Sequence, residues 1–66
     1  MSAEKLTRMA NQIAANLAAQ GTEAATAQTA QHIRDFWDPR MKAGLMAAPA
    51  EALSPIARAA RERLTR

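Results

Sequence analysis

The stretch His32-Ile33-Arg34-Asp35-Phe36-Trp37-Asp38-Pro39-Arg40-Met41 contains the only Phe, the only Trp and the only His of the chain. Proline disfavours the α conformation in the residue before it, so Asp38 is expected to leave helical geometry. Asp is also a favoured N-cap, and Pro fits the first position of a helix, where its missing N–H costs nothing. The stretch therefore predicts that one helix ends around Trp37 and that another begins at Pro39.

Trp37 is expected in the elbow between these two helices, where two roles are open to its side chain. It either anchors the chain's own small core, which is the simpler interpretation, or docks on a partner. Arg34 and Arg40 lie close to it on either side, and interface hot spots favour Trp and Arg. The alternative for both arginines is an ordinary solvated surface.

Upstream of this stretch, the sequence predicts two helices separated by Gly21. Ser2 is a candidate cap for the first, Gly21 a terminator, and Thr22 a candidate cap for the second. Helical spacing places one apolar stripe along the first helix: Leu6, Met9, Ala10, Ile13 and Leu17. A thinner stripe follows along the second: Ala27, Ala30, Ile33 and Trp37.

Downstream, the helix that begins at Pro39 is expected to end before Pro49, and Ser54-Pro55 repeats the cap-then-proline signal. Residues 47–52 are expected to form a loop or a further helical turn. Apolar residues on these last two helices are Met41, Leu45, Met46, Ile56, Ala60 and Leu64. With no alternating run, the chain is predicted to be all-α: a small bundle of three to four short helices, a helical hairpin plus short appended helices, in one domain over residues 1–66.

The composition indicates a small core. Of the 66 residues, 48% are hydrophobic, but 18 of those 32 residues are Ala, and Cys is absent. Disulfides and thiolate metal sites are therefore excluded, and a partner chain is the remaining means of stabilisation. The N-terminal region resembles neither an export signal nor a membrane span, so a cytoplasmic location without membrane contact is expected.

The net charge of +3 is unevenly distributed, since Arg58, Arg61, Arg63 and Arg66 lie in the last nine residues. Together with Arg34 and Arg40 they form the basis of one alternative function, a small basic helical module that binds nucleic acid. Cations in a last helical turn also complement the helix dipole, which is the simpler interpretation. Because a helix-turn-helix pattern is lacking, we expect no nucleic acid partner.

Catalytic chemistry is not expected in this chain. Ser2 and Ser54 are better explained as caps than as nucleophiles, and His32 with Asp35 makes only two of the ligands that a metal site needs. We therefore predict no catalytic, cofactor-binding or metal-binding residue. The amides of Asn11 and Gln12, beside the first apolar stripe, either bond a partner's backbone or face water.

Three elements occur in an order that resembles a known family: Arg8-Met9-Ala10-Asn11-Gln12-Ile13, then HIRDFWDPRM over residues 32–41, then Leu53-Ser54-Pro55-Ile56 with Ala59-Ala60. The pattern extends from about Lys5 to Leu64 and is similar to the delta subunit of soluble, molybdenum-dependent, NAD-linked formate dehydrogenases. The order of Trp and Pro in FWDPRM makes that element the most specific of the three.

The resemblance implies a non-catalytic accessory subunit of a cytoplasmic complex that oxidises formate to carbon dioxide with NAD. It implies that the alpha subunit, the expected partner, holds a bis-molybdopterin guanine dinucleotide cofactor with molybdenum and iron–sulfur clusters. Beta and gamma subunits would carry flavin and further clusters, and this chain no cofactor. Its implied role is to assist assembly or stability of the alpha subunit, permanently or transiently. Residues predicted to bind the partner are Met9, Asn11, Gln12, Ile13, His32, Arg34, Phe36, Trp37, Asp38, Pro39, Arg40 and Met41.

Overall fold

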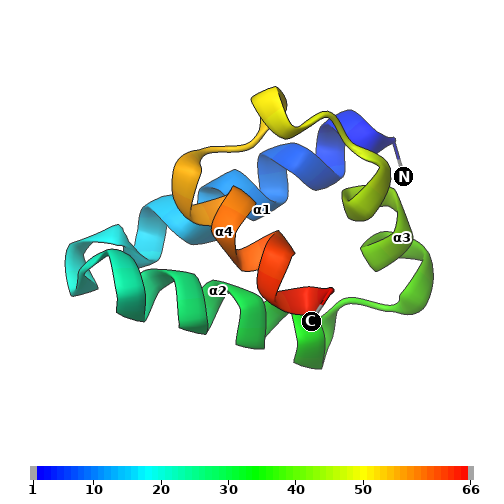
Figure 1. The fold of residues 1–66 in the computed structure, drawn as a ribbon. Coiled ribbons are helices and arrows are strands. Elements are labelled where there is room, and N and C mark those ends of the chain that lie inside the picture. The colour runs from blue at the N-terminus through cyan, green and yellow to red at the C-terminus, as the bar shows by residue number, and fades with distance from the viewer. Residues whose placement is uncertain (1, 66) are drawn as a thin grey trace.

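A computed structural model describes residues 2–65, which form four α-helices and two short 3-10 turns. In chain order the elements are α1 (Ala3–Leu17), η1 (Ala18–Gln20), α2 (Thr22–Phe36), α3 (Pro39–Ala47), η2 (Ala50–Ala52) and α4 (Pro55–Leu64). Helices α1 and α2 run antiparallel as a hairpin, and α4 packs on both of them (Figure 1). Helix α3 lies beside the N-terminal part of α1 (Figure 1). The predicted all-α bundle, a hairpin with short appended helices, is confirmed.

Side-chain caps fix where three of the helices begin. The Ser2 hydroxyl accepts a hydrogen bond from the backbone N–H of Lys5, at 3.2 Å. The Asp38 carboxylate accepts one from Met41 N–H at 2.8 Å, and the Ser54 hydroxyl accepts one from Ala57 N–H at 3.4 Å. Because a proline follows each of the last two caps, the starts of α3 and α4 are where the sequence predicts them.

The start of α2 differs by one residue from the prediction. Gly21, with φ of 100°, occupies the N-cap position, and Thr22 is the first helical residue. The Gly21 carbonyl already accepts the first helical hydrogen bond, from Ala25 N–H at 2.8 Å. The prediction that Thr22 caps this helix was therefore wrong. A glycine tolerates this positive φ, so one residue both ends η1 and begins α2.

The core combines a few large side chains with many alanines. The large buried residues are Leu6, Ile33, Trp37, Leu45 and Leu53, and the buried alanines are Ala10, Ala14, Ala25, Ala30, Ala48, Ala57 and Ala60. Small side chains allow helices to approach closely, so α1, α2 and α4 gain contact without much side-chain bulk. The stripe predicted for α2 is correct at three positions and wrong at Ala27, which is exposed. Thr26 and Thr29 are buried on α2 instead.

Arginines from α4 hold the segment that connects it to α3. The Arg61 guanidinium donates to the carbonyl oxygens of Leu45, at 3.2 Å, and Ala48, at 2.6 Å. Arg58 donates to the carbonyls of Ala50, at 3.1 Å, and Leu53, at 3.3 Å. Carbonyls at the end of a helix lack helical partners and carry partial negative charge, so a cation there is favourable. Residues 47–52, predicted as a loop or a further turn, contain η2.

We expect Arg61→Met to lower the free energy of unfolding by about 2 kcal/mol, because two charge-assisted hydrogen bonds to backbone carbonyls are lost. The matched control is Arg63→Met. Arg63 forms an ion pair with the well-exposed Glu23, and such surface pairs contribute about 0–1 kcal/mol. Urea denaturation followed by circular dichroism compares the two variants. Equal effects would contradict the structural role of Arg61.

Candidate partner-binding surface

Trp37 and Phe36 are adjacent in sequence but lie in opposite environments. Trp37 is only 5% exposed and belongs to the core cluster with Leu6, Ile33 and Leu45. Its backbone leaves helical geometry, with ψ of 135°, as expected at the end of α2. Phe36 is 74% exposed. Of the two roles open to Trp37, the structure shows the core-filling one, and it places the solvent-facing aromatic ring one residue earlier.

His32 shares the exposed side of α2 with Phe36. The two ring centroids are 4.9 Å apart and the ring planes are tilted by 37°. The residues are four apart, which brings side chains together on one helix face. The pair therefore forms an exposed aromatic ridge near the C-terminal end of α2.

The apolar residues predicted on α1 divide between surface and core. Met9 is 37% exposed, whereas Ile13 is partly buried and packs against the core. Met41 on α3 is also partly buried against the core. Met9 is therefore the one large side chain of the predicted α1 stripe that presents a substantial apolar surface to solvent.

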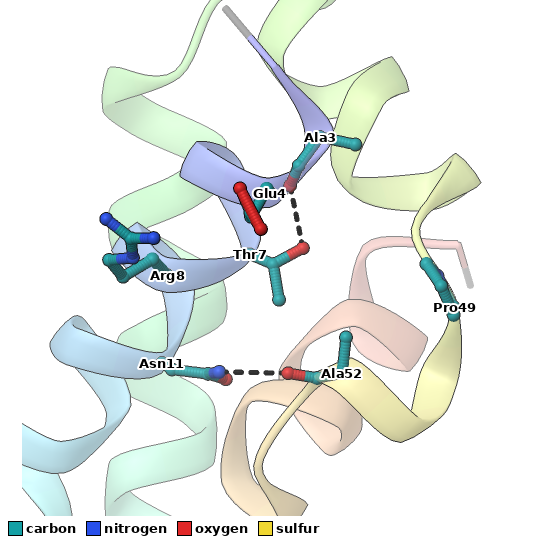
Figure 2. A pocket seen from close by; sticks show the side chains of 7 residues that line it. All are labelled: Ala3, Glu4, Thr7, Arg8, Asn11, Pro49 and Ala52. Atoms are coloured by element: carbon teal, nitrogen blue, oxygen red, sulfur yellow. Dashed lines mark hydrogen bonds between the residues drawn. The ribbon is translucent and has the colours of Figure 1, made fainter.

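The two neighbouring amides on α1 have different roles. The Asn11 side chain donates to the carbonyl oxygen of Ala52, at 3.0 Å (Figure 2), and accepts from the backbone N–H of Ser54, at 2.9 Å. It thereby fastens α1 to the segment before α4. Gln12 is exposed and donates to Asn16, at 3.0 Å. Asn11 therefore has neither of the two predicted roles, since it bonds the backbone of its own chain rather than that of a partner.

The residues around the elbow between α2 and α3 also differ in their roles. Asp38 and Pro39 begin α3, so their side chains serve the local turn. Arg34 and Arg40 are both exposed. Lys42 donates to the backbone carbonyl of Arg34, at 2.9 Å, which ties α3 to the end of α2.

Four of the predicted partner-binding residues lie on one side of the hairpin. Two residues mark the opposite side of the hairpin. Asn11 bonds the segment before α4, and Glu23 forms an ion pair with Arg63 of α4. An α-helix turns about 100° per residue, so Met9 projects roughly opposite to Asn11, and Phe36 roughly opposite to Glu23. Ile13 lies four residues after Met9, and His32 lies four residues before Phe36, so each projects to the same side of its helix as that residue. We call this set, Met9, Ile13, His32 and Phe36, the hairpin face.

Two cations that were not among the predicted site residues border the hairpin face. Lys5 and Arg8 line a shallow hollow on α1 together with Met9 and Gln12. The spacing carries a signal for Lys5, which precedes Met9 by four residues and therefore lies on the same side of α1. Arg8 is about 100° around the helix from Met9 and also lines the hollow toward the segment around η2.

A second hollow, of about 450 Å³, lies between α1 and the segment around η2 (Figure 2). Glu4, Thr7 and Arg8 are among the residues that line this hollow. The Thr7 hydroxyl donates to the carbonyl oxygen of Ala3, at 2.8 Å.

Within residues 2–65, no group of three or more His, Asp or Glu side chains is arranged to hold a metal ion. In the same range, no helix combines the length and apolar character needed to cross a membrane.

Fold and surface together define a class of protein: a small helical domain whose polar side chains mainly hold its own backbone, and which exposes Phe36 and Met9. A family model described as the NADH-dependent formate dehydrogenase delta subunit, FdsD, matches residues 5–61. The chain belongs to this family, as the resemblance of its sequence indicated. Comparisons with curated proteins and with solved structures gave no match.

We expect Trp37→Ala to lower the free energy of unfolding by about 3–5 kcal/mol, or to unfold the chain outright, because it leaves a cavity in a small core. Phe36→Ala is the matched control: its ring is exposed, so a change within about 0.5 kcal/mol is expected. Circular dichroism at 222 nm during urea denaturation measures both. A Trp37→Ala variant as stable as the parent would contradict the core role.

The adjacent amides provide another paired test. Asn11→Ala removes two hydrogen bonds and leaves the Ser54 N–H and the Ala52 carbonyl without this partner, so a loss of about 1–3 kcal/mol is expected. Gln12→Ala, which removes one exposed contact within α1, is expected to change stability by less than about 0.5 kcal/mol. Thermal and urea unfolding measure the loss of stability in the two variants. Equal losses would argue against Asn11 as the link between α1 and the segment before α4.

Proposed function

We propose that this chain is a non-catalytic accessory subunit of a cytoplasmic, molybdenum-dependent, NAD-linked formate dehydrogenase. In this role it assists assembly or stability of the catalytic alpha subunit. The observation that carries the proposal is family membership over residues 5–61. The partner subunits would hold the bis-molybdopterin guanine dinucleotide with its molybdenum, the iron–sulfur clusters and the flavin. The reaction, formate and NAD to carbon dioxide and NADH, would take place on them.

The roles of the polar side chains support a structural rather than a chemical function. Ser2, Asp38 and Ser54 cap helices, and Asn11 bonds backbone groups. Each of these groups is thus used to hold the fold. His32, the only histidine, lies against the Phe36 ring.

The C-terminal arginines bear on the alternative of a nucleic-acid-binding module. Arg58 and Arg61 donate to backbone carbonyls, and Arg63 pairs with Glu23. Phosphate binding would compete with these internal contacts. The geometry therefore favours a protein partner over a nucleic acid.

We expect the alpha, beta and gamma subunits, produced with and without this chain, to differ in the yield of active complex. Without it, formate-dependent NAD reduction per milligram of complex should fall severalfold, together with molybdenum content if cofactor insertion is the assisted step. Native mass measurement of the complex shows whether the chain remains bound. Unchanged yield, activity and metal content would contradict the proposal, as would nucleic acid binding at about 150 mM salt without any dehydrogenase subunit.

A further inference from the structure

We infer that the hairpin face, with Lys5 and Arg8 at its edge, is the surface that docks on a larger protein. The matching surface on that protein is an apolar recess bordered by carboxylates. This inference rests on the proposed function and adds to it which side of the domain is bound and by what chemistry.

The exposed apolar side chains point to this side of the molecule. Within residues 2–65, Met9 and Phe36 are the large hydrophobic side chains classed as exposed. They come from different helices and from distant parts of the sequence, yet both project away from α4. Single exposed hydrophobic residues are common and need no explanation, but here two of them lie on the side of the hairpin away from α4, where Ile13 is also only partly buried.

The remaining surface is less suited to binding. Helix α4 and η2 cover the other side of the hairpin, where Asn11, Arg58 and Glu23 have internal partners. Trp37 lies in the core. A partner that used the α4 side would have to compete with contacts that hold the fold, whereas the hairpin face is available without any rearrangement.

The charges specify the chemistry of the partner. Within residues 2–65 the only ion pair is that of Arg63 with Glu23, so Lys5 and Arg8 pair with no carboxylate of that range. Both are exposed and lie next to Met9 around one hollow. Opposite charges across an interface steer association and fix the orientation of the partners. Carboxylates are therefore expected on the partner where α1 is seated.

The composition of this surface favours a different protein over a second copy of the chain. Interfaces between identical subunits are markedly apolar, whereas other interfaces combine aromatic residues, Met and Arg at the centre with a polar rim. Here Phe36 and Met9 are accompanied by Lys5, Arg8 and Gln12. This mixture fits the second kind of interface, with Phe36 as the anchoring side chain.

The test measures binding to the formate dehydrogenase complex purified without this chain, by biolayer interferometry at about 150 mM salt. We expect Phe36→Ala and Met9→Ala each to weaken binding about tenfold or more, because both would lose a desolvated anchor. The double charge reversal Lys5→Glu/Arg8→Glu should weaken binding by a similar factor. It should also reverse the effect of added salt.

The control is Arg34→Glu/Arg40→Glu, which reverses two exposed cations that the sequence predicted to bind the partner but that lie outside the hairpin face. If the hairpin face is the docking surface, this variant should change affinity less than about threefold. Circular dichroism of each variant verifies that it is folded. If the control weakens binding while the hairpin-face variants bind like the parent, the surface is assigned wrongly and the proposed function stands. If the parent chain does not bind the complex at all, the proposed function is contradicted, and with it the inference that rests on it. Self-association that Phe36→Ala abolishes, without binding to the complex, would assign the face to a second copy and overturn the inference.

Discussion

The arrangement of the whole domain depends on the break between α2 and α3. Asp38 caps α3 through the N–H of Met41, and Pro39 fixes the first helical residue. Trp37, four residues after Ile33, lies on the buried side of α2 and belongs to the core cluster with Leu6, Ile33 and Leu45, and the chain leaves helical geometry at this residue. The break directly after the largest side chain of the core thus directs α3 back along α1.

The basic residues at the two ends of this small domain have different physical roles. Those on α4 are used inside the molecule, where guanidinium groups bond carbonyls near the end of α3 and around η2. Those near the start of α1, Lys5 and Arg8, remain exposed. A net charge of +3 says nothing about this division. Of the two ends of the chain, the N-terminal helix is therefore the one whose cations do not bond the chain's own backbone, although the sequence has its densest positive charge at the other end.

The sequence predicted the features that depend on neighbouring residues. Caps followed by proline at Asp38 and Ser54 are local, and both helix starts were correct. Helical periodicity placed Trp37 on the apolar stripe of α2 with Ala30 and Ile33, and all three are buried. It did not show that the ring of Phe36 is exposed beside them. The bonds of Asn11 span 41 and 43 residues and depend on how α1 and η2 meet. The sequence prediction included the four residues of the hairpin face. Which of the predicted residues lie in the core and which at the surface depends on how the helices pack, so the sequence did not determine it.

The seven buried alanines have a consequence for how this domain tolerates sequence change. Ala10, Ala57 and Ala60 are fully buried, so a larger residue there must displace its neighbours, and glycine would loosen the helix that carries it. These positions are therefore expected to tolerate neither larger residues nor glycine. The outer residues of α1 and α2 face no such limit, so the partner-binding properties of this scaffold can be redesigned or can diverge while its interior stays fixed.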